Sequence, residues 1–195
     1  MSLTTKLLTG REVEESLDAL ATLRIEIFRE FPYLYDGNRE SELRYLKGYA
    51  QAAEACVLTV TDADRIVGAA TGMPLQHEQK ELIAPFAATS YPVDSVYYVG
   101  ELLFYPAYRN RGLGMKLLSM MEDKIRSLGS YRYLTCATVV RPDDHPHRPA
   151  NYVPIERFLH RTEFRAVPAT TTSITWLETD GGSRDHQMQF WIKVL

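Results

Sequence analysis

The most constraining feature of the sequence is an unbroken order of strand, glycine turn, helix and strand in the middle of the chain. Residues 95–105 (SVYYVGELLFY) and 132–140 (RYLTCATVV) are apolar runs of strand length, and residues 115–128 repeat apolar side chains at helical spacing. Runs of the first kind are typical of buried strands, and spacing of the second kind is typical of a helix. Two such strands joined through a helix form a parallel βαβ unit with a right-handed crossover. The chain is therefore predicted to be an α/β protein.

The remaining elements extend this unit into a mixed sheet with helices on its faces. Amphipathic spacing predicts helices over residues 11–28, 41–53 and 155–161. Runs rich in β-branched and aromatic residues predict a hairpin over residues 56–75 and two final strands over residues 170–182 and 188–195. With 195 residues, of which 45% are hydrophobic and 24% charged, the chain fits one domain spanning residues 1–195.

Charge and composition exclude several classes of partner. The net charge of −3 and the pI near 6.0 give no general attraction to nucleic acids or anionic membranes. No apolar run approaches the roughly 20 residues of a membrane span, and the first residues lack the apolar core of a signal peptide. Cys56 and Cys136 lie in apolar, β-branched surroundings, which favours buried free thiols in a reducing compartment. We therefore expect a cytoplasmic protein with no nucleic-acid or membrane partner.

The glycine turn, YRNRGLGMK at residues 108–116, narrows the choice of ligand. A P-loop requires Lys and Ser or Thr directly after its last glycine, but Met115 follows Gly114 here, and a dinucleotide fingerprint requires a third glycine. What remains is a helix N-terminus with free N–H groups beside two arginines, and such a site favours an anion such as a diphosphate. The alternative is that the glycines only allow the chain to reverse.

The segment Arg109 to Gly114 (RNRGLG) resembles the Q/R-x-x-G-x-G/A motif of the GNAT superfamily of acyl-CoA-dependent N-acyltransferases. Residues 100–114 (GELLFYPAYRNRGLG) resemble the fourth strand and following loop of that family along their whole length, and the order of predicted elements also matches. The resemblance implies a GNAT-like fold, with a central, mostly antiparallel sheet that is splayed at one parallel strand pair and flanked by helices.

The resemblance also implies acetyl-CoA as the acyl donor, bound without a metal. The backbone of Arg111 to Met115 would cradle the coenzyme A diphosphate, and Arg109 would add positive charge. The strand that carries Leu103 and Tyr105 would be bulged or splayed, so that pantetheine reaches its unpaired backbone groups. The expected cofactor-binding residues are Leu103, Tyr105, Arg109, Asn110, Arg111, Gly112, Leu113, Gly114 and Met115.

Acyl transfer to an amine requires a base, because an alkylammonium with a pKa of about 10.4 is almost fully protonated at neutral pH. Glu101 is the candidate, since it lies on the strand expected beside the thioester, where apolar neighbours would raise its pKa. The alternative is that Glu101 faces solvent or pairs with an arginine. For the developing oxyanion, the resemblance implies the N–H of Leu103 as the donor.

The sequence departs from the family at the group that protonates the leaving thiolate. Many members place a tyrosine there, in a pattern like F-Y-x-x-x-G-F, whereas the matching run RFLHRTEF aligns Leu159 with the tyrosine and Glu163 with the glycine. His160 is adjacent but points about 100° away on a helix, and Tyr152 and Tyr108 are other candidate donors. A thiol with a pKa of about 8.5 is also a tolerable leaving group without full protonation.

Two loops are candidates for the acceptor site. The segment FPYLYDG supplies Tyr33 and Tyr35, which either stack on an acceptor or pack as core, and the loop after the second parallel strand supplies His145 and Tyr152. That loop leaves the carboxyl end of its strand, where open α/β sheets place substrate contacts. Its segment from Asp143 to His147 offers carboxylates and imidazoles, so a metal site is an alternative interpretation of the same loop.

These observations predict an N-acetyltransferase that moves the acetyl group of acetyl-CoA to a primary amine by direct attack, with Glu101 as general base. The acceptor is a small molecule or peptide, and a second copy of the chain is a candidate partner because homodimers are common in the family. Four alternatives stay open: an inactive acyl-CoA-binding regulatory module, which Leu159 would allow; a small metal-dependent hydrolase built on the Asp143 to His147 loop; a Cys136–His145 nucleophilic pair; and an interaction domain with a purely structural turn.

Overall fold

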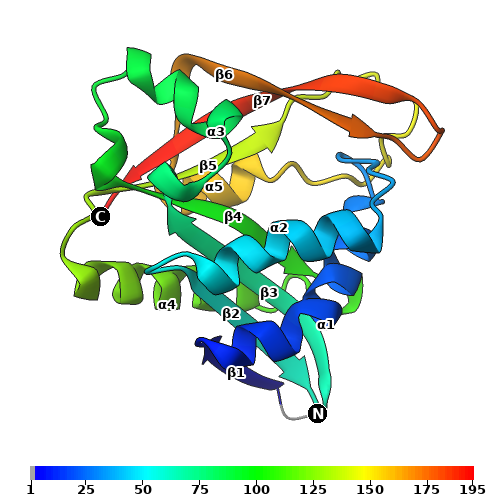
Figure 1. Ribbon diagram of the computed structural model, residues 1–195. Helices are drawn as coiled ribbons and strands as arrows, with labels where there is room; N and C mark the ends of the chain where they lie inside the picture. Colours follow the sequence, from blue (N-terminus) through cyan, green and yellow to red (C-terminus); the bar gives the residue numbers. More distant parts are fainter. Residues whose placement is uncertain (1–2) are drawn as a thin grey trace.

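The computed structural model describes residues 3–195, which form one seven-stranded sheet with helices on both faces (Figure 1). The strands are β1 (Leu3–Leu8), β2 (Cys56–Asp62), β3 (Arg65–Pro74), β4 (Val96–Phe104), β5 (Tyr133–Val139), β6 (Arg165–Leu177) and β7 (Ser183–Val194). The helices are α1 (Arg11–Phe28), α2 (Arg39–Gln51), α3 (Lys80–Ile83), α4 (Leu113–Leu128) and α5 (Glu156–Arg161), with short 3-10 turns η1 (Leu75–His77), η2 (Ala84–Ala88), η3 (Val93–Ser95) and η4 (Pro106–Tyr108).

The strand order confirms the predicted mixed sheet. It runs β1-β2-β3-β4-β5-β7-β6, and each neighbouring pair is antiparallel except β4 with β5, which are parallel. α1 and α2 pack on one face, where Leu20, Leu46 and Leu103 share an apolar cluster. α4 and α5 cover the other face, where Met121 and Leu159 pack in a second cluster. Because both faces are covered, eight successive residues of β3 are buried, as in strands that lie between two layers.

The predicted helices form where the spacing places them, with ends that shift by one or two residues: α4 begins at Leu113 instead of Met115, and α5 at Glu156 instead of Ile155. Capping explains the shift at the start of α2. α1 has the predicted bounds and buries the stripe of Val13, Leu17, Leu20 and Leu23. α2 begins at Arg39 rather than at Ser41, because the side chain of Asn38 accepts a hydrogen bond of 3.0 Å from the Ser41 amide. An asparagine in this position satisfies one of the free N–H groups of the first turn and so fixes where the helix starts.

A β-bulge interrupts β4 in front of its most polar residue. Thr71 of β3 pairs with Glu101, but the next residue, Gly72, pairs with Val99, which leaves Gly100 as the extra residue. A Cβ atom at position 100 would overlap the Tyr49 hydroxyl and would lie 3.1 Å from Thr71 Oγ1. The glycine therefore allows hydroxyl groups to approach the bulged backbone, and bulges of this kind re-aim the side chains that follow them.

β4 and β5 separate soon after they meet, as the family resemblance implies for the parallel pair. Their ladder covers Val96 to Tyr98 on β4 and Tyr133 to Thr135 on β5. β4 then continues beside β3 as far as Phe104, and β5 continues beside β7 as far as Val139. The sheet is thus divided into two halves that are joined by three residue pairs and diverge toward the carboxyl ends of β4 and β5.

The two cysteines are free thiols, with Cys56 buried and Cys136 half-buried. Burial raises the pKa of each to about 12, so both thiols stay protonated at neutral pH. Within residues 3–195, no helix has the length and apolar character that crossing a membrane requires.

Candidate active site

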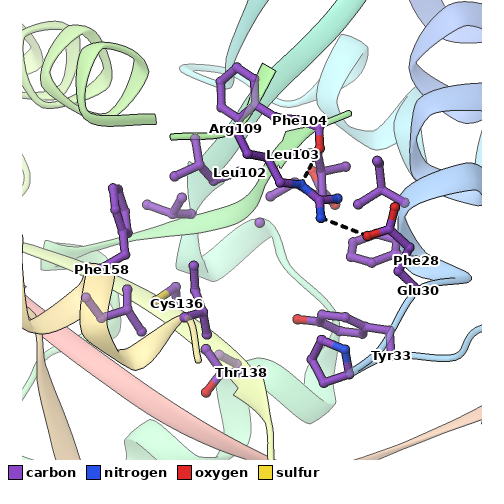
Figure 2. A pocket seen from close by; sticks show the side chains of 18 of the residues that line it. Phe28, Glu30, Tyr33, Leu102, Leu103, Phe104, Arg109, Cys136, Thr138 and Phe158 are labelled. Atoms are coloured by element: carbon purple, nitrogen blue, oxygen red, sulfur yellow. Dashed lines mark hydrogen bonds and ion pairs between the residues drawn. The ribbon is translucent and has the colours of Figure 1, made fainter. Parts of the chain in front are cut away.

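A cavity of about 300 Å³ lies where β4 and β5 diverge (Figure 2). One wall is the exposed edge of β4 from Val99 to Phe104, and the opposite wall is β5 from Cys136 to Thr138. The segment after α1, residues 30–33, closes one end, and the loop and helix after β5 close another. Its other side chains include Ile27, Phe28, Arg109, Leu118, Tyr152, Val153, Ile155, Phe158, Leu159 and Phe164. The cavity is largely apolar and is made by elements that are far apart in the sequence, as ligand pockets usually are.

The glycine turn opens α4 next to this cavity. Gly112 is the N-cap of α4 in the left-handed conformation (φ 75°), and the preceding Asn110 is also left-handed (φ 59°). The first bond to the cap runs from the Lys116 amide to the Gly112 carbonyl, at 3.1 Å. The amides of residues 113–115 therefore have no acceptor inside the helix and point out of its positive end. A Cβ at Gly114 would lie 3.6 Å from Leu102 of β4 and from Phe158 of α5, so the turn borders the splay.

The predicted role of Arg109, which was to add charge at the turn, has to be weighed against the contacts that its side chain makes. Its Nε donates to the Phe104 carbonyl at 2.8 Å, and its Nη1 pairs with Glu30 Oε2 at 2.8 Å (Figure 2). The guanidinium thus ties the last carbonyl of β4 to the end of α1 and lines the cavity. The Arg111 guanidinium lies 5.5 Å from the centre of the Tyr108 ring.

Tyr105 is a correction among the expected cofactor residues. Its amide donates to the Val67 carbonyl at 3.1 Å and its carbonyl accepts from the Tyr108 amide at 2.9 Å, so both backbone groups are occupied. Its ring lies 4.4 Å under the Arg65 guanidinium, away from the cavity. The strand bends into η4 one residue later, which removes Tyr105 from the splayed edge. Leu103, in contrast, pairs with Ala69 and lines the cavity.

Glu101 is buried and belongs to an ion cluster that the sequence analysis did not find. Its side chain is 2% exposed, and Oε1 pairs with Arg24 of α1. Arg24 also pairs with Glu42 of α2, so one guanidinium lies between two carboxylates. Among the described residues, Glu101 Oε2 has no hydrogen-bond partner, and Glu101 lines the cavity. A solvent-facing Glu101 is therefore excluded, whereas the arginine-paired alternative is correct for one oxygen only.

Arg24 is held in place by aromatic rings as well as by carboxylates. Its guanidinium lies 4.3 Å from the centre of the Tyr45 ring and 5.0 Å from that of Phe28, which favours a cation. Burial opposes the charge, but Tyr45 and Glu42 raise the pKa of Arg24 above its usual value. A signal for this residue exists in the sequence. Arg24 follows Leu20 by four residues on the apolar face of an amphipathic helix, where a charge needs a buried partner.

Of the predicted acceptor residues, Tyr33 and Tyr152 line the cavity, but Tyr35 and His145 do not. Figure 2 shows the Tyr33 hydroxyl pointing toward the β5 wall, where Cys136 and Thr138 lie. Tyr35 instead pairs with Glu178 in an isolated bridge, because the chain has already turned outward at Leu34 (φ 52°). His145 packs on Phe31 at a ring distance of 5.5 Å, and its Nδ1 accepts from the His147 amide at 3.2 Å.

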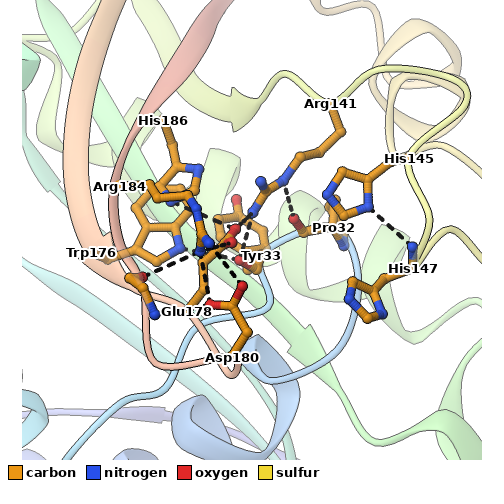
Figure 3. Close-up of polar contacts among 11 residues, drawn as sticks. Pro32, Tyr33, Arg141, His145, His147, Trp176, Glu178, Asp180, Arg184 and His186 are labelled. Carbon is orange, nitrogen blue, oxygen red and sulfur yellow. Dashed lines mark hydrogen bonds and ion pairs between the residues drawn. The ribbon is translucent and has the colours of Figure 1, made fainter.

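The position of Tyr33 is fixed by a second ion cluster, which the sequence also did not reveal (Figure 3). Arg141, two residues after β5, donates to the carbonyls of Pro32 at 2.7 Å and Tyr33 at 2.9 Å, and pairs with Glu178 at 2.5 Å. Trp176 of β6 donates to the same Tyr33 carbonyl at 3.1 Å. The carbonyls that flank the Tyr33 ring are therefore clamped to the β6–β7 hairpin while its hydroxyl stays in the cavity.

The candidates for protonating the leaving thiolate differ in whether their side chains line the cavity. Tyr108 donates its hydroxyl to Asp62 Oδ2 at 2.8 Å and so faces the end of β2. His160 packs against Trp191 at a ring distance of 5.2 Å. Leu159 lines the cavity and has no polar side-chain atom, whereas Tyr152 lines it with a hydroxyl group, and so does Tyr33, which the sequence analysis did not name for this role. Burial raises the pKa of both tyrosines, so each stays a neutral donor.

The proposed metal ligands and the thiol pair are not brought together as reactive groups. Across residues 3–195, no group of three or more His, Cys, Asp or Glu side chains has the arrangement of a metal site. Asp143 pairs with Arg148 at 2.8 Å. Cys136 lines the cavity, whereas His145 does not, and the raised pKa of Cys136 makes it a poor nucleophile.

The sequence matches the family model described as "Acetyltransferase (GNAT) family" over residues 19–147. This match covers the second half of α1, the whole β4–turn–α4–β5 unit and the start of the loop after β5. The chain therefore belongs to the GNAT acetyltransferase family, and acyl transfer is the general activity that this membership supports.

Solved structures share the fold at low sequence identity. Arabidopsis thaliana NAA60 in complex with a bisubstrate analogue has a TM-score of 0.63 and 13% identity, covering 100% of this chain and 99% of that one. Salmonella typhimurium yncA with its cofactor acetyl-CoA has a TM-score of 0.61 and 14% identity, covering 100% and 95%. The ribosomal-protein-alanine N-acetyltransferase of Brucella melitensis has a TM-score of 0.62 and 15% identity, covering 98% and 99%. No curated protein sequence matches the chain.

Proposed function

We propose that the protein transfers the acetyl group of acetyl-CoA to a primary amine. The observation that carries the proposal is the cavity between β4 and β5, which has a carboxylate, Glu101, in its wall and the free amides of a helix N-terminus at its border. Acetyl-CoA as donor is supported by similar structures of yncA with its cofactor acetyl-CoA and of NAA60 in complex with acetyl-CoA. A primary amine as acceptor is supported by the family match and by a buried carboxylate suited to take up a proton.

The donor is held mainly by backbone. The amides of Arg111 to Met115 bind the diphosphate, because they are unpaired and lie at the positive end of α4. The β4 edge beyond Tyr98 offers pantetheine the peptide groups that β5 no longer uses. Asn110 contributes through its left-handed backbone, which turns the chain into α4. Arg109 organises the Phe104 carbonyl rather than the diphosphate.

The transfer itself proceeds by direct attack. Glu101 takes a proton from the acceptor ammonium, and the free amine attacks the thioester carbonyl while the N–H of Leu103 donates to the oxyanion. The nitrogen of the tetrahedral intermediate then loses its second proton as the carbon–sulfur bond breaks, and the departing thiolate takes up one proton, so that the amide and the free thiol of CoA are the products. The hydroxyls of Tyr33 and Tyr152 donate to the departing sulfur, in place of the tyrosine that the family has where Leu159 stands here. Neither cysteine carries the acyl group.

The acceptor end of the cavity favours an apolar or aromatic amine without a carboxylate. Its walls are the rings of Phe28, Phe31, Tyr33 and Tyr152. Such rings attract an ammonium group as well as apolar surface. Among residues 3–195, Arg109 is the one arginine that lines the cavity, and it is already paired with Glu30, while Glu101 adds negative charge. We expect 2-phenylethylamine to be acetylated with at least about 10-fold higher kcat/KM than phenylalanine, which a thiol-release assay measures.

The decisive test compares the two ends of α4. Gly112 and Gly129 cap opposite ends of the same helix in the same conformation (φ 75° and 74°), and neither has an atom within 4 Å of an added Cβ. An Asp at either position therefore causes similar backbone strain, but only at position 112 does it place an anion against the diphosphate. Calorimetry with acetyl-CoA and CoA should show micromolar binding for the wild type and Gly129→Asp, and none for Gly112→Asp.

Two other results would change the conclusion. Absence of binding by the wild type contradicts the proposed function. Binding without turnover of any amine favours the alternative that Leu159 suggests, an acyl-CoA-binding module without activity.

A further inference from the structure

His186 of β7 is a buried histidine whose ring nitrogen Nε2 has no hydrogen-bond partner in the described part of the chain. The residue is 5% exposed, and its ring stacks on Trp176 with the centres 3.7 Å apart (Figure 3). Nε2 lies 3.7 Å from Glu178 Oε1, which is near enough for charges to attract but too far for a hydrogen bond. Buried polar atoms are almost always satisfied, so an unpaired imidazole nitrogen beside a carboxylate requires an explanation.

His186 lies against both of the groups that hold the backbone of Tyr33. Trp176, which stacks on the imidazole ring, donates its indole N–H to the Tyr33 carbonyl at 3.1 Å. Glu178 binds the Arg141 guanidinium at 2.5 Å through Oε1, the same oxygen that faces Nε2 of His186. Arg141 in turn donates to the Tyr33 carbonyl at 2.9 Å. The imidazole is therefore placed to affect both side chains that donate to this carbonyl.

The ion pairs near His186 leave Arg141 with less support than its neighbour. Arg184 of β7 pairs with both Glu178 and Asp180, at 2.8 Å each. Arg141, from the loop after β5, pairs among the described residues with Glu178 alone. A group that competes for Glu178 Oε1 therefore weakens the hold on Arg141 first.

The groups around His186 keep its ring neutral at neutral pH. Burial and the nearby Arg141 lower the pKa of His186 below 6.5. The other charged or titratable groups that surround it are Glu178 and Asp180 at the hairpin turn, Arg184 and Asp185 on β7, and Tyr33 after α1, whose ring lies 5.9 Å from that of Trp176. In acid the ring gains a proton. Nε2–H then carries positive charge next to Glu178 Oε1 and attracts this oxygen away from Arg141.

We propose that His186 is a positioning residue of the acceptor site: its neutral ring leaves Glu178 to Arg141 and keeps Tyr33 clamped, whereas its protonated ring draws Glu178 away and loosens the acceptor wall. The inference rests on the proposed function, because Tyr33 lines the cavity in which the amine is proposed to bind. The amine then binds less tightly in acid than the titration of Glu101 alone would cause.

The test compares two histidines that pack on tryptophan rings. His186→Phe keeps an aromatic ring on Trp176 but cannot take up a proton, and His160→Phe makes the same change on Trp191. Calorimetry with 2-phenylethylamine and the CoA complex, which cannot react, measures the amine Kd between pH 5 and 8. As the pH drops, the Kd of the wild type should rise up to about 10-fold more than that of His186→Phe. His160→Phe should follow the wild type at every pH.

The same coupling can be measured from the histidine. If a proton on His186 weakens amine binding about 10-fold, saturating amine must weaken the binding of that proton by the same factor and so lower the pKa of His186. An NMR titration of the His186 ring in the wild-type CoA complex, with and without 2-phenylethylamine, tests this without any variant. A pKa that the amine leaves unchanged overturns the proposal.

The role of His186 and the proposed function fail differently. A ratio of wild-type Kd to His186→Phe Kd that is the same at pH 5 and pH 8 overturns the role of His186 and leaves the acetyltransferase intact. A wild type that binds no CoA overturns the proposed function, and NMR signals of the Tyr33 ring then decide about the clamp. They should shift together with the titration of His186 in the wild type and stay fixed in His186→Phe, whereas fixed signals in the wild type overturn the clamp.

Discussion

Two buried arginine–glutamate clusters flank the cavity, and they use their arginines in opposite ways. Arg24 gives its N–H groups to two carboxylates, Glu42 and Glu101, on different elements. Arg141 gives two of its N–H groups to the backbone carbonyls of Pro32 and Tyr33, and one to Glu178. The first cluster contains one cation and two anions, whereas Glu178 in the second also pairs with Arg184. Arg184 also pairs with Asp180, so the second cluster contains two cations and two anions and is balanced, whereas the first has an excess negative charge.

This difference in partners suggests different roles for the two clusters, one in proton transfer and one in positioning the backbone. The Arg24 cluster includes Glu101, a residue that lines the cavity, and leaves one oxygen of Glu101 unpaired within the described chain, which suits a group that exchanges protons. The Arg141 cluster presents no atom to the cavity and instead fixes the backbone that carries Tyr33. Burial of an ion pair is therefore no guide to its role. The useful guide is whether the arginine is satisfied by carboxylates or by backbone.

The largest expected effect is that of Glu101→Gln. Removing the base should lower kcat by about 10² to 10⁴-fold and leave the Kd for acetyl-CoA unchanged. Glu178→Gln is the matched control, because Glu178 is also buried in an arginine cluster, with 9% of its side chain exposed. Steady-state kinetics on both variants measure the contrast. Equal losses of kcat would show that the clusters do not differ in the way proposed.

The next effect is on stability. Arg24→Met leaves Glu42 and Glu101 buried without their cation, and breaking a buried pair in this way costs about 3–5 kcal/mol. Urea unfolding should show this loss, and adding Glu42→Gln and Glu101→Gln to the same variant should recover most of it. A loss below about 1 kcal/mol would mean that the two carboxylates find other partners or become protonated at little cost.

A smaller effect is expected from Arg141→Met. Losing the bonds to the carbonyls of Pro32 and Tyr33 loosens the acceptor wall but not the donor site, so KM for the amine should rise about 10-fold, or about 1.4 kcal/mol. The Kd for acetyl-CoA should not change. Kinetics with the amine varied at saturating acetyl-CoA measure this split. A fall in kcat with unchanged KM would place Arg141 in the chemistry instead.

The smallest effect concerns pH and the second cluster. His186 stacks on Trp176 with ring centres 3.7 Å apart, and burial together with the nearby Arg141 lowers the pKa of His186 below 6.5. The unfolded chain then binds more protons than the folded one at acidic pH, so stability should fall as the pH drops below about 6.5. His186→Phe should remove this component. Urea unfolding between pH 5 and 8 of both proteins tests it.

Local patterns in the sequence were enough to predict the elements at the centre of the fold. The β4–turn–α4–β5 unit follows from hydrophobic spacing and two glycines, and Glu101 follows from its place on that strand. The alignment of Glu163 with a family glycine agrees with its left-handed backbone (φ 68°), a conformation that favours glycine.

The partners of these residues could not be predicted in the same way. Arg24 and Glu101 are 77 positions apart, and Arg141 lies 108 positions from Tyr33, so no local spacing joins them. The bulge at Gly100 depends on the register of β3 against β4, and one glycine in a strand does not specify it. Tyr105 was misplaced for a similar reason, because a bend of one residue at η4 decides which edge its amide faces.

The separation of β4 from β5 has a consequence for how such a protein can diverge. The proposed grip on the donor is made of peptide groups, at the free edge of a strand and the first turn of a helix, and every amino acid except proline supplies the same N–H and C=O. Substitutions of side chains therefore remove few of the proposed contacts with the donor, except where they replace the glycines. This agrees with the 13% to 15% identity that accompanies TM-scores of 0.61 to 0.63 in the three structures compared. The proposed acceptor wall, in contrast, is made of side chains, so replacing one of them changes the surface that an amine would contact.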